Sequence, residues 1–112
     1  MNPNPNLIGR SIIGAATAPS ITEKAWQAKV IEAAKWLGWS VYHTHDSRRS
    51  EAGFPDLVLV RDQRLIFAEL KSPKGRVTPA QTQWLWLLGE TFAEVYLWRP
   101  DDWPTVQERL AR

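Results

Sequence analysis

The sequence has 112 residues, no cysteine and a formal net charge of +2. A chain of this length forms one domain with a buried core, and the absence of cysteine excludes disulfides and thiolate zinc sites. No apolar run approaches the ~20 residues that a transmembrane helix needs, and the first residues lack the pattern of a signal peptide. The small positive charge permits nucleic-acid binding without arguing for it.

Residues 1–20 are rich in Asn, Pro, Gly, Ala and Thr and show neither helical nor strand periodicity. We therefore expect an N-terminal arm here, outside a folded domain that occupies residues 21–112. Two apolar pairs, Leu7-Ile8 and Ile12-Ile13, interrupt the polar composition. They would dock either on a second subunit or back on the same chain.

A first helix is predicted between a cap at Ser20 or Thr22 and an end at Gly38. Its buried stripe follows helical spacing and contains Trp26, Val30, Ala33, Ala34 and Leu37. Glu23 stands at the start of this helix. From the residues alone, a capping box between Glu23 and Ser20 explains it as well as a functional role does. A strand is expected next, over residues 39–45.

Two apolar segments, residues 56–60 and 65–71, flank a polar turn at residues 61–64 and predict a β-hairpin. Side chains alternate across a strand, so Glu69 and Lys71 point to the same face. In an antiparallel pair, Asp56 lies near the same end of the hairpin. Two carboxylates and an ammonium group would then converge on one small volume.

This convergence has two explanations. One is a structural ion pair between Glu69 and Lys71, next to a turn-forming Asp56. The other is a site for Mg²⁺ or Mn²⁺, because these hard cations prefer carboxylate oxygens and complete their shell with water and phosphate. Three charges on so apolar a sheet favour a functional site.

Two polar loops flank the hairpin. The first contains Ser47, Arg48, Arg49 and Ser50 and leads into Gly53 and Pro55, which would hold Asp56 rigidly. The second follows Lys71 and contains Lys74 and Arg76. Hydroxyl, ammonium and guanidinium groups bind phosphates, so both loops suit a nucleic-acid backbone. A solvated loop without a binding role is the alternative.

The remaining chain predicts a helix, a strand and a short helix, which completes the order α-β-β-β-α-β-α. The helix begins at Thr78-Pro79-Ala80-Gln81, so helix capping alone explains Gln81. This helix is apolar on most of its surface, and Trp86 is the best candidate for a contact with another subunit. Aromatic residues at strand spacing are more often core than stacked on bases, and this applies to Tyr96, Trp98 and Trp103.

The ordered motifs resemble the virus-type replication and repair nuclease domain (VRR-NUC) of the PD-(D/E)xK superfamily over residues 21–100. The set comprises Glu23, Ser47-Arg48-Arg49-Ser50, Gly53-Phe54-Pro55-Asp56-Leu57, Glu69-Leu70-Lys71 and Thr78-Pro79-Ala80-Gln81. The resemblance implies an α/β fold with a restriction-endonuclease-like core, in which helices flank a central mixed sheet.

The resemblance also implies a function. It points to a metal-dependent endodeoxyribonuclease of phage or bacterial type, acting in the cytoplasm on branched DNA such as Holliday junctions, in DNA repair. Glu23, Asp56 and Glu69, with the Leu70 carbonyl, would hold Mg²⁺ or Mn²⁺. Lys71 and Gln81 would assist the reaction at the phosphodiester.

A symmetric homodimer is expected, because resolving a four-way junction needs two symmetric incisions. Two alternatives remain open. One is a catalytically inactive DNA-binding module of the same fold, and the other is a nuclease that acts on RNA.

Overall fold

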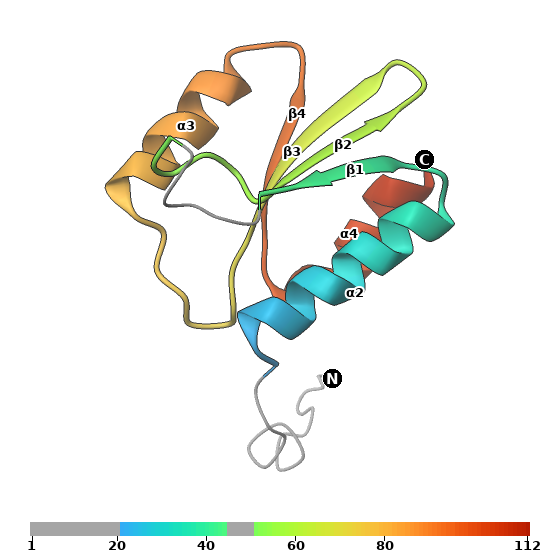
Figure 1. The fold of residues 1–112 in the computed structure, drawn as a ribbon, viewed down its shortest axis with the longest axis horizontal. Coiled ribbons are helices and arrows are strands. Elements are labelled where there is room, and N and C mark those ends of the chain that lie inside the picture. Colours follow the sequence, from blue (N-terminus) through green and yellow to red (C-terminus); the bar gives the residue numbers. More distant parts are fainter. Residues whose placement is uncertain (1–20, 45–50) are drawn as a thin grey trace, which may run out of the picture.

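The structure is a computed structural model and describes residues 21–44 and 51–112 (Figure 1). Its elements are α2 (Glu23–Trp36), β1 (Ser40–His43), β2 (Leu57–Arg61), β3 (Arg64–Leu70), α3 (Pro79–Gly89), β4 (Glu94–Trp98), the 3₁₀ turn η2 (Pro100–Asp102) and α4 (Trp103–Ala111). The predicted element order is therefore confirmed. The predicted arm and the segment with Ser47, Arg48, Arg49 and Ser50 lie outside the described residues. No helix in the described ranges is long and apolar enough to cross a membrane.

The four strands form one mixed sheet in the order β1-β2-β3-β4, which confirms the expected α/β class. The first two pairings are antiparallel and β3 pairs with β4 in parallel. The hairpin turn is shorter than predicted, because Arg61 pairs with Arg64 and only two residues remain between the strands. Asp62 makes this tight turn with a φ of 55°, a left-handed conformation that Asp tolerates.

The first helix begins and ends close to the predicted residues. Thr22 is the N-cap, and its side chain accepts a hydrogen bond from the Ala25 N–H at 3.1 Å. Gly38 follows the last turn with a φ of +90°, which a residue without Cβ adopts most easily. The next strand is shorter than expected. It starts at Ser40, because the Trp39 backbone N–H still donates to the Ala34 carbonyl of α2 at 3.0 Å. The Trp39 indole is buried in the core and donates to the Leu110 carbonyl at 3.0 Å.

The main core lies between the sheet and the helices α2 and α4. Figure 1 shows these two helices on one side of the sheet and α3 on the other. Of the predicted stripe on α2, three residues are fully buried and two are partly buried against the core. The buried apolar residues are Trp26, Val30, Ala34, Trp39, Leu57, Leu59, Ile66, Ala68, Leu70, Trp98, Val106 and Leu110.

Aromatic side chains connect the end of β4 with the two helices of this core. The Trp26 indole N–H donates to the Trp98 carbonyl at 3.0 Å, and the Trp26 ring meets the edge of Trp103 with centroids 5.9 Å apart. Tyr96 stacks on Trp98 at 4.9 Å. These rings are occupied by packing, which agrees with the expectation that they belong to the core.

The opposite face of the sheet is covered much less completely. No residue of α3 is fully buried, and the contact depends on Phe54, whose ring meets Trp84 and Phe67 edge-on at 5.1 and 5.9 Å. Several apolar side chains around α3 remain exposed: Trp86 by 65%, Leu87 by 45%, Phe92 by 88% and Leu97 by 38%. We call these four residues the α3 surface.

Candidate active site

The β2–β3 hairpin brings Asp56 and Glu69 to the same end of the sheet. Leu57 pairs with Ala68, so the residue before Leu57 lies opposite the residue after Ala68. The backbone fixes Asp56 on both sides. Its Oδ2 accepts from the Leu70 N–H at 2.9 Å, and its carbonyl accepts from the Thr44 N–H at 3.1 Å. The carboxylate therefore has a defined position next to Glu69.

Glu69 is a buried carboxylate with incomplete hydrogen bonding. Only 1% of the residue is exposed. Its Oε2 accepts from Gln81 Nε2 at 3.0 Å and lies 3.7 Å from the ammonium nitrogen of Lys71. Its Oε1 is buried and has no hydrogen-bond partner among residues 21–44 and 51–112. Such an oxygen is costly in free energy unless a further ligand reaches it.

The electrostatics of this end of the sheet favour protonation or a bound cation. Burial, followed by the negative charge of Asp56, raises the pKa of Glu69 to about 8, while Lys71 opposes the rise. Glu94 in the same sheet behaves in the opposite way. Arg64 donates two hydrogen bonds of 2.7 Å to Glu94 and lowers its pKa. Among residues 21–44 and 51–112, no guanidinium group pairs with Asp56 and Glu69 in this way, so within this part of the chain the pair carries excess negative charge when ionised.

Gln81 combines two roles that the sequence left as alternatives. Its side-chain oxygen accepts from the Thr78 N–H at 2.9 Å, and the Thr78 hydroxyl accepts from the Gln81 N–H at 3.2 Å, which completes a capping box. The amide nitrogen of the same side chain donates to Glu69. The start of α3 is therefore coupled directly to the buried carboxylate.

Gly53 sets how closely the loop before Asp56 approaches α3. It has a φ of +86°. A Cβ at this position would lie 2.5 Å from the Ala80 carbonyl carbon and 2.7 Å from the Gln81 nitrogen. The sequence indicated a rigid entry to Asp56 but not this backbone contact, because the partner lies in a distant helix.

Gly53→Ala should destabilise the fold by about 2 kcal/mol or more, because it combines left-handed backbone strain with a clash against α3. Thermal unfolding measures the change. Gly89→Ala is the matched control, because a Cβ there meets nothing within 4 Å. Equal melting temperatures for the Gly53→Ala protein and the unsubstituted protein would contradict the close contact.

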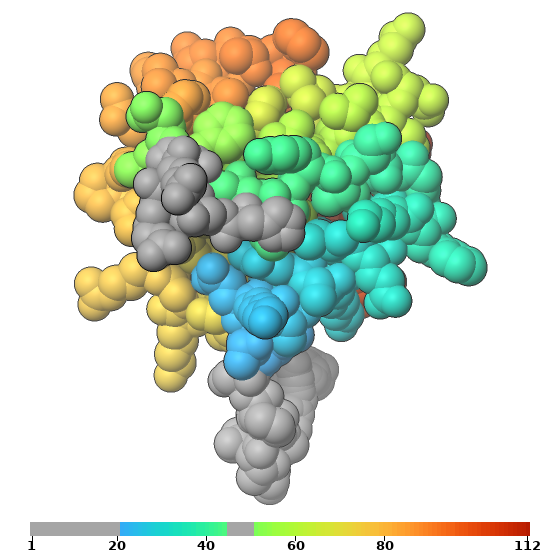
Figure 2. Space-filling view, in the orientation of Figure 1, coloured from blue at the N-terminus to red at the C-terminus, as the bar shows by residue number. Residues whose placement is uncertain are grey.

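The other predicted site residues lie around this pair. Glu23 is half-buried in the first turn of α2, and its charge contributes to the raised pKa of Glu69. Lys71 is 8% exposed, whereas Lys74 and Arg76 are exposed on the loop after β3. Figure 2 shows side chains of the segment between β3 and α3 projecting at the lower left of the molecule. Over residues 21–44 and 51–112, no three His, Cys, Asp or Glu side chains form a group that could hold a metal ion.

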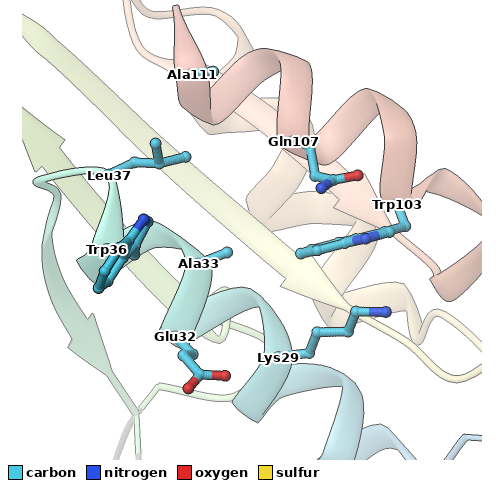
Figure 3. Close-up of a pocket in the computed structure, with 8 residues that line it drawn as sticks. All are labelled: Lys29, Glu32, Ala33, Trp36, Leu37, Trp103, Gln107 and Ala111. Atoms are coloured by element: carbon cyan, nitrogen blue, oxygen red, sulfur yellow. The ribbon is translucent and has the colours of Figure 1, made fainter.

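A separate cavity of about 560 Å³ lies between α2 and α4 (Figure 3). Its lining consists of Lys29, Glu32, Ala33, Trp36, Leu37, Trp103, Gln107 and Ala111. Two of these lining residues contact each other, since the Lys29 ammonium lies 4.5 Å from the centroid of the Trp103 ring. None of the lining residues belongs to the carboxylate pair or its neighbours, so this cavity is distinct from the candidate active site.

The chain is an α/β protein whose mixed sheet has a carboxylate pair and a lysine at one end. The VRR-NUC domain model matches residues 17–99. The chain therefore belongs to the VRR-NUC family, a family of nucleases. Its fold is similar to that of a solved VRR_NUC domain protein, with a TM-score of 0.61, 19% identity, and coverage of 82% of this chain and 89% of that chain. A search of curated proteins found no match.

Proposed function

We propose that this protein is a metal-dependent endonuclease that hydrolyses phosphodiester bonds in DNA. Family membership supports the class of activity. The observation that carries the proposal is the buried Glu69, whose pKa is raised to about 8 beside Asp56 and whose Oε2 lies 3.7 Å from the Lys71 ammonium. A buried carboxylate pair costs free energy unless a cation compensates it. A purely DNA-binding module would gain nothing from such a pair.

Asp56 and Glu69 are the proposed protein ligands of Mg²⁺ or Mn²⁺, with the Leu70 carbonyl as a further ligand. Glu23 would join them only when a bound ion draws it closer, because these three carboxylates do not form one metal-binding group among the described residues. The residues fit such an ion, since Glu69 Oε1 is buried with no hydrogen-bond partner in the described part of the chain and the second carboxylate lies beside it. Mg²⁺ commonly keeps several waters, so a small number of carboxylates is sufficient. A bound divalent ion acidifies water and offsets charge on the scissile phosphate.

The remaining residues position and bind the substrate in this proposal. Gln81 holds Glu69 through its 3.0 Å hydrogen bond, and the Leu70 N–H holds Asp56. Lys71 stabilises negative charge on the reacting phosphate or orients the attacking water. Lys74 and Arg76, together with the predicted Ser47, Arg48, Arg49 and Ser50, bind the DNA backbone.

Cleavage of labelled linear, flapped and four-way DNA and of a matched RNA tests this function, with Mg²⁺, Mn²⁺ or EDTA. We expect cleavage of DNA only with a divalent ion, and fastest cleavage of the four-way junction. Faster cleavage of RNA would favour an RNA nuclease instead. Binding of DNA without cleavage of any substrate would favour the inactive module. The cytoplasmic setting in a bacterial or phage-infected cell stays a prediction.

The proposal includes a homodimer whose two subunits meet at the α3 surface. The four residues of this surface are apolar and between 38% and 88% exposed, and no residue of α3 is fully buried. An exposed apolar patch of this kind marks an interface more often than a free surface. A two-fold dimer would supply two sites for two symmetric incisions in a four-way junction.

Light scattering at micromolar concentration should give about twice the chain mass of 12.8 kDa. Trp86→Glu should weaken dimerisation by roughly 30-fold or more, on the scale of losing a tryptophan hot spot. Trp36→Glu is the matched control, because Trp36 is 88% exposed on the other side of the sheet. Deleting residues 1–19 should weaken association further if the arm contributes. A monomer that cuts both strands of a junction would disprove the dimer.

A further inference from the structure

We propose that Arg99 is a positioning residue that fixes the loop of residues 72–76 for DNA binding. This inference rests on the proposed function. The Arg99 Nη1 donates to the carbonyls of Ser72 and Gly75, each at 2.8 Å, and lies 3.4 Å from the Pro73 carbonyl. One guanidinium nitrogen therefore holds both ends of a short turn.

The backbone that carries Arg99 is itself fixed. Asp102 Oδ2 accepts from the Arg99 N–H at 2.9 Å, and the preceding Trp98 carbonyl accepts from the Lys71 N–H at 3.1 Å. Parallel pairing thus places the chain leaving β3 beside the chain leaving β4 (Figure 1). Arg99 extends this pairing past the end of the sheet, where no strand hydrogen bonds remain to order the loop.

The held loop borders the candidate active site. The Gly75 N–H donates to the Ser72 carbonyl at 3.1 Å, which closes the turn. A Cβ on Gly75 would lie 3.0 Å from Ser72 Oγ and 3.4 Å from Lys71 Cδ, so the turn folds against the stem of the lysine. A change in this turn would consequently move Lys74 and Arg76 relative to Lys71.

The contact also has an electrostatic consequence. Carbonyl oxygens carry partial negative charge and repel phosphate unless a donor compensates them. Arg99 compensates at least two of them with a cation. The loop therefore offers its exposed Lys74 and Arg76 to the DNA backbone without competing acceptors from these carbonyls.

Two substitutions distinguish positioning from a simple charge. Arg99→Met removes both the charge and the hydrogen bonds, whereas Arg99→Lys keeps the charge but is shorter and lacks the planar fork. If Arg99 positions the loop, both variants should bind a four-way junction in EDTA roughly 10-fold more weakly. Their salt-dependence slope should fall by about two units, because Lys74 and Arg76 both lose their phosphate contacts. The proposal would be overturned if the Arg99→Lys protein bound DNA with normal affinity and the Arg99→Met protein lost only about one unit of salt-dependence slope.

A double-mutant cycle provides the second test. In a Lys74→Gln/Arg76→Gln background, Arg99→Met should have little further effect on binding, because its consequences pass through those two side chains. Additive effects would overturn the proposal. Arg112→Met is the control for loss of one positive charge, since Arg112 bonds Glu108 at 3.0 Å at the far end of α4.

Hydrogen exchange of the Gly75 amide tests the same inference without DNA. Exchange should be at least about 10-fold faster in both Arg99 variants than in the unsubstituted protein, while melting temperature and the exchange of β3 amides stay close to normal. Unchanged Gly75 exchange would overturn the positioning role. If the Gly75 amide exchanged faster in the variants but the unsubstituted protein neither bound nor cut nucleic acid, the loop contact would be supported and the proposed function would be rejected.

Discussion

Glu69→Gln and Asp56→Asn should each reduce phosphodiester cleavage by roughly 1,000-fold or more while the fold stays intact. Both substitutions preserve side-chain size and remove a negative charge from the pair. The amide oxygen that replaces the Glu69 carboxylate can still accept a hydrogen bond from Gln81, so local packing is retained. DNA binding should persist and can even tighten, because one source of repulsion toward phosphate is lost.

Cleavage of a labelled four-way junction in Mg²⁺ or Mn²⁺ measures the effect, with circular dichroism as the check on folding. Asp62→Asn is the matched control. Its side chain is 89% exposed in the turn at the opposite end of the hairpin, and asparagine tolerates the same left-handed backbone. Full activity of either site variant in Mg²⁺ would exclude the assignment of that carboxylate.

The raised pKa of Glu69 gives this assignment a second readout. The pKa is about 8 in the folded state, against an ordinary value of 4.5 for a glutamate. Between these two values the folded state binds more protons than the unfolded state, so the free energy of unfolding falls as pH rises through this window. We expect the melting temperature of the metal-free protein to fall between pH 4.5 and about pH 8, the two pKa values that bound the window. Glu69→Gln should flatten that dependence, and added Mn²⁺ should oppose the loss only in the unsubstituted protein.

The carboxylate pair could be predicted because it depends on local rules. Alternation along a strand put Glu69 and Lys71 on one face, and an antiparallel hairpin put Asp56 at the same end. The turn length was wrong because Arg61 and Arg64, although polar, pair as the last residue of β2 and the first residue of β3. Polarity alone does not distinguish a turn residue from a charged strand end on a half-exposed face.

Contacts between distant elements could not be predicted in the same way. Gly53 is typical of a flexible turn in the sequence, and its approach to Ala80 depends on where α3 lies. Arg99 looks like the end of a strand, yet it bonds two carbonyls more than twenty positions earlier in the chain. Gln81 was ambiguous for a different reason, because one amide side chain has both an acceptor and a donor and uses each. Residue type limits such contacts without selecting the partner.

Lys71→Met should reduce turnover by ~100-fold or more, with a much smaller loss of DNA affinity. Methionine keeps an apolar stem against the turn at Gly75 and removes only the ammonium group, so the loop should stay in place. Lys74→Met is the comparison, because Lys74 is exposed and should affect mainly binding and its salt dependence, by about one unit of slope. Single-turnover kinetics with saturating enzyme separates the two effects. Normal turnover with poor affinity would assign Lys71 to phosphate binding.

Part of the Lys71 effect would come indirectly through Glu69, and the pH dependence of the variant separates the two contributions. The ammonium group lowers the pKa of Glu69 against the effects of burial and Asp56. Without the ammonium group, the pKa of Glu69 should rise further. Glu69 would then be protonated to a greater extent at neutral pH and would bind a metal ion less well. Raising the pH or the Mn²⁺ concentration should therefore restore the part of the turnover that the variant loses because Glu69 is protonated. The loss that remains at saturating Mn²⁺ and high pH measures stabilisation of the reacting phosphate or water by Lys71 itself. If saturating metal restored full turnover, Lys71 would act only on Glu69, as a positioning residue for the carboxylate pair.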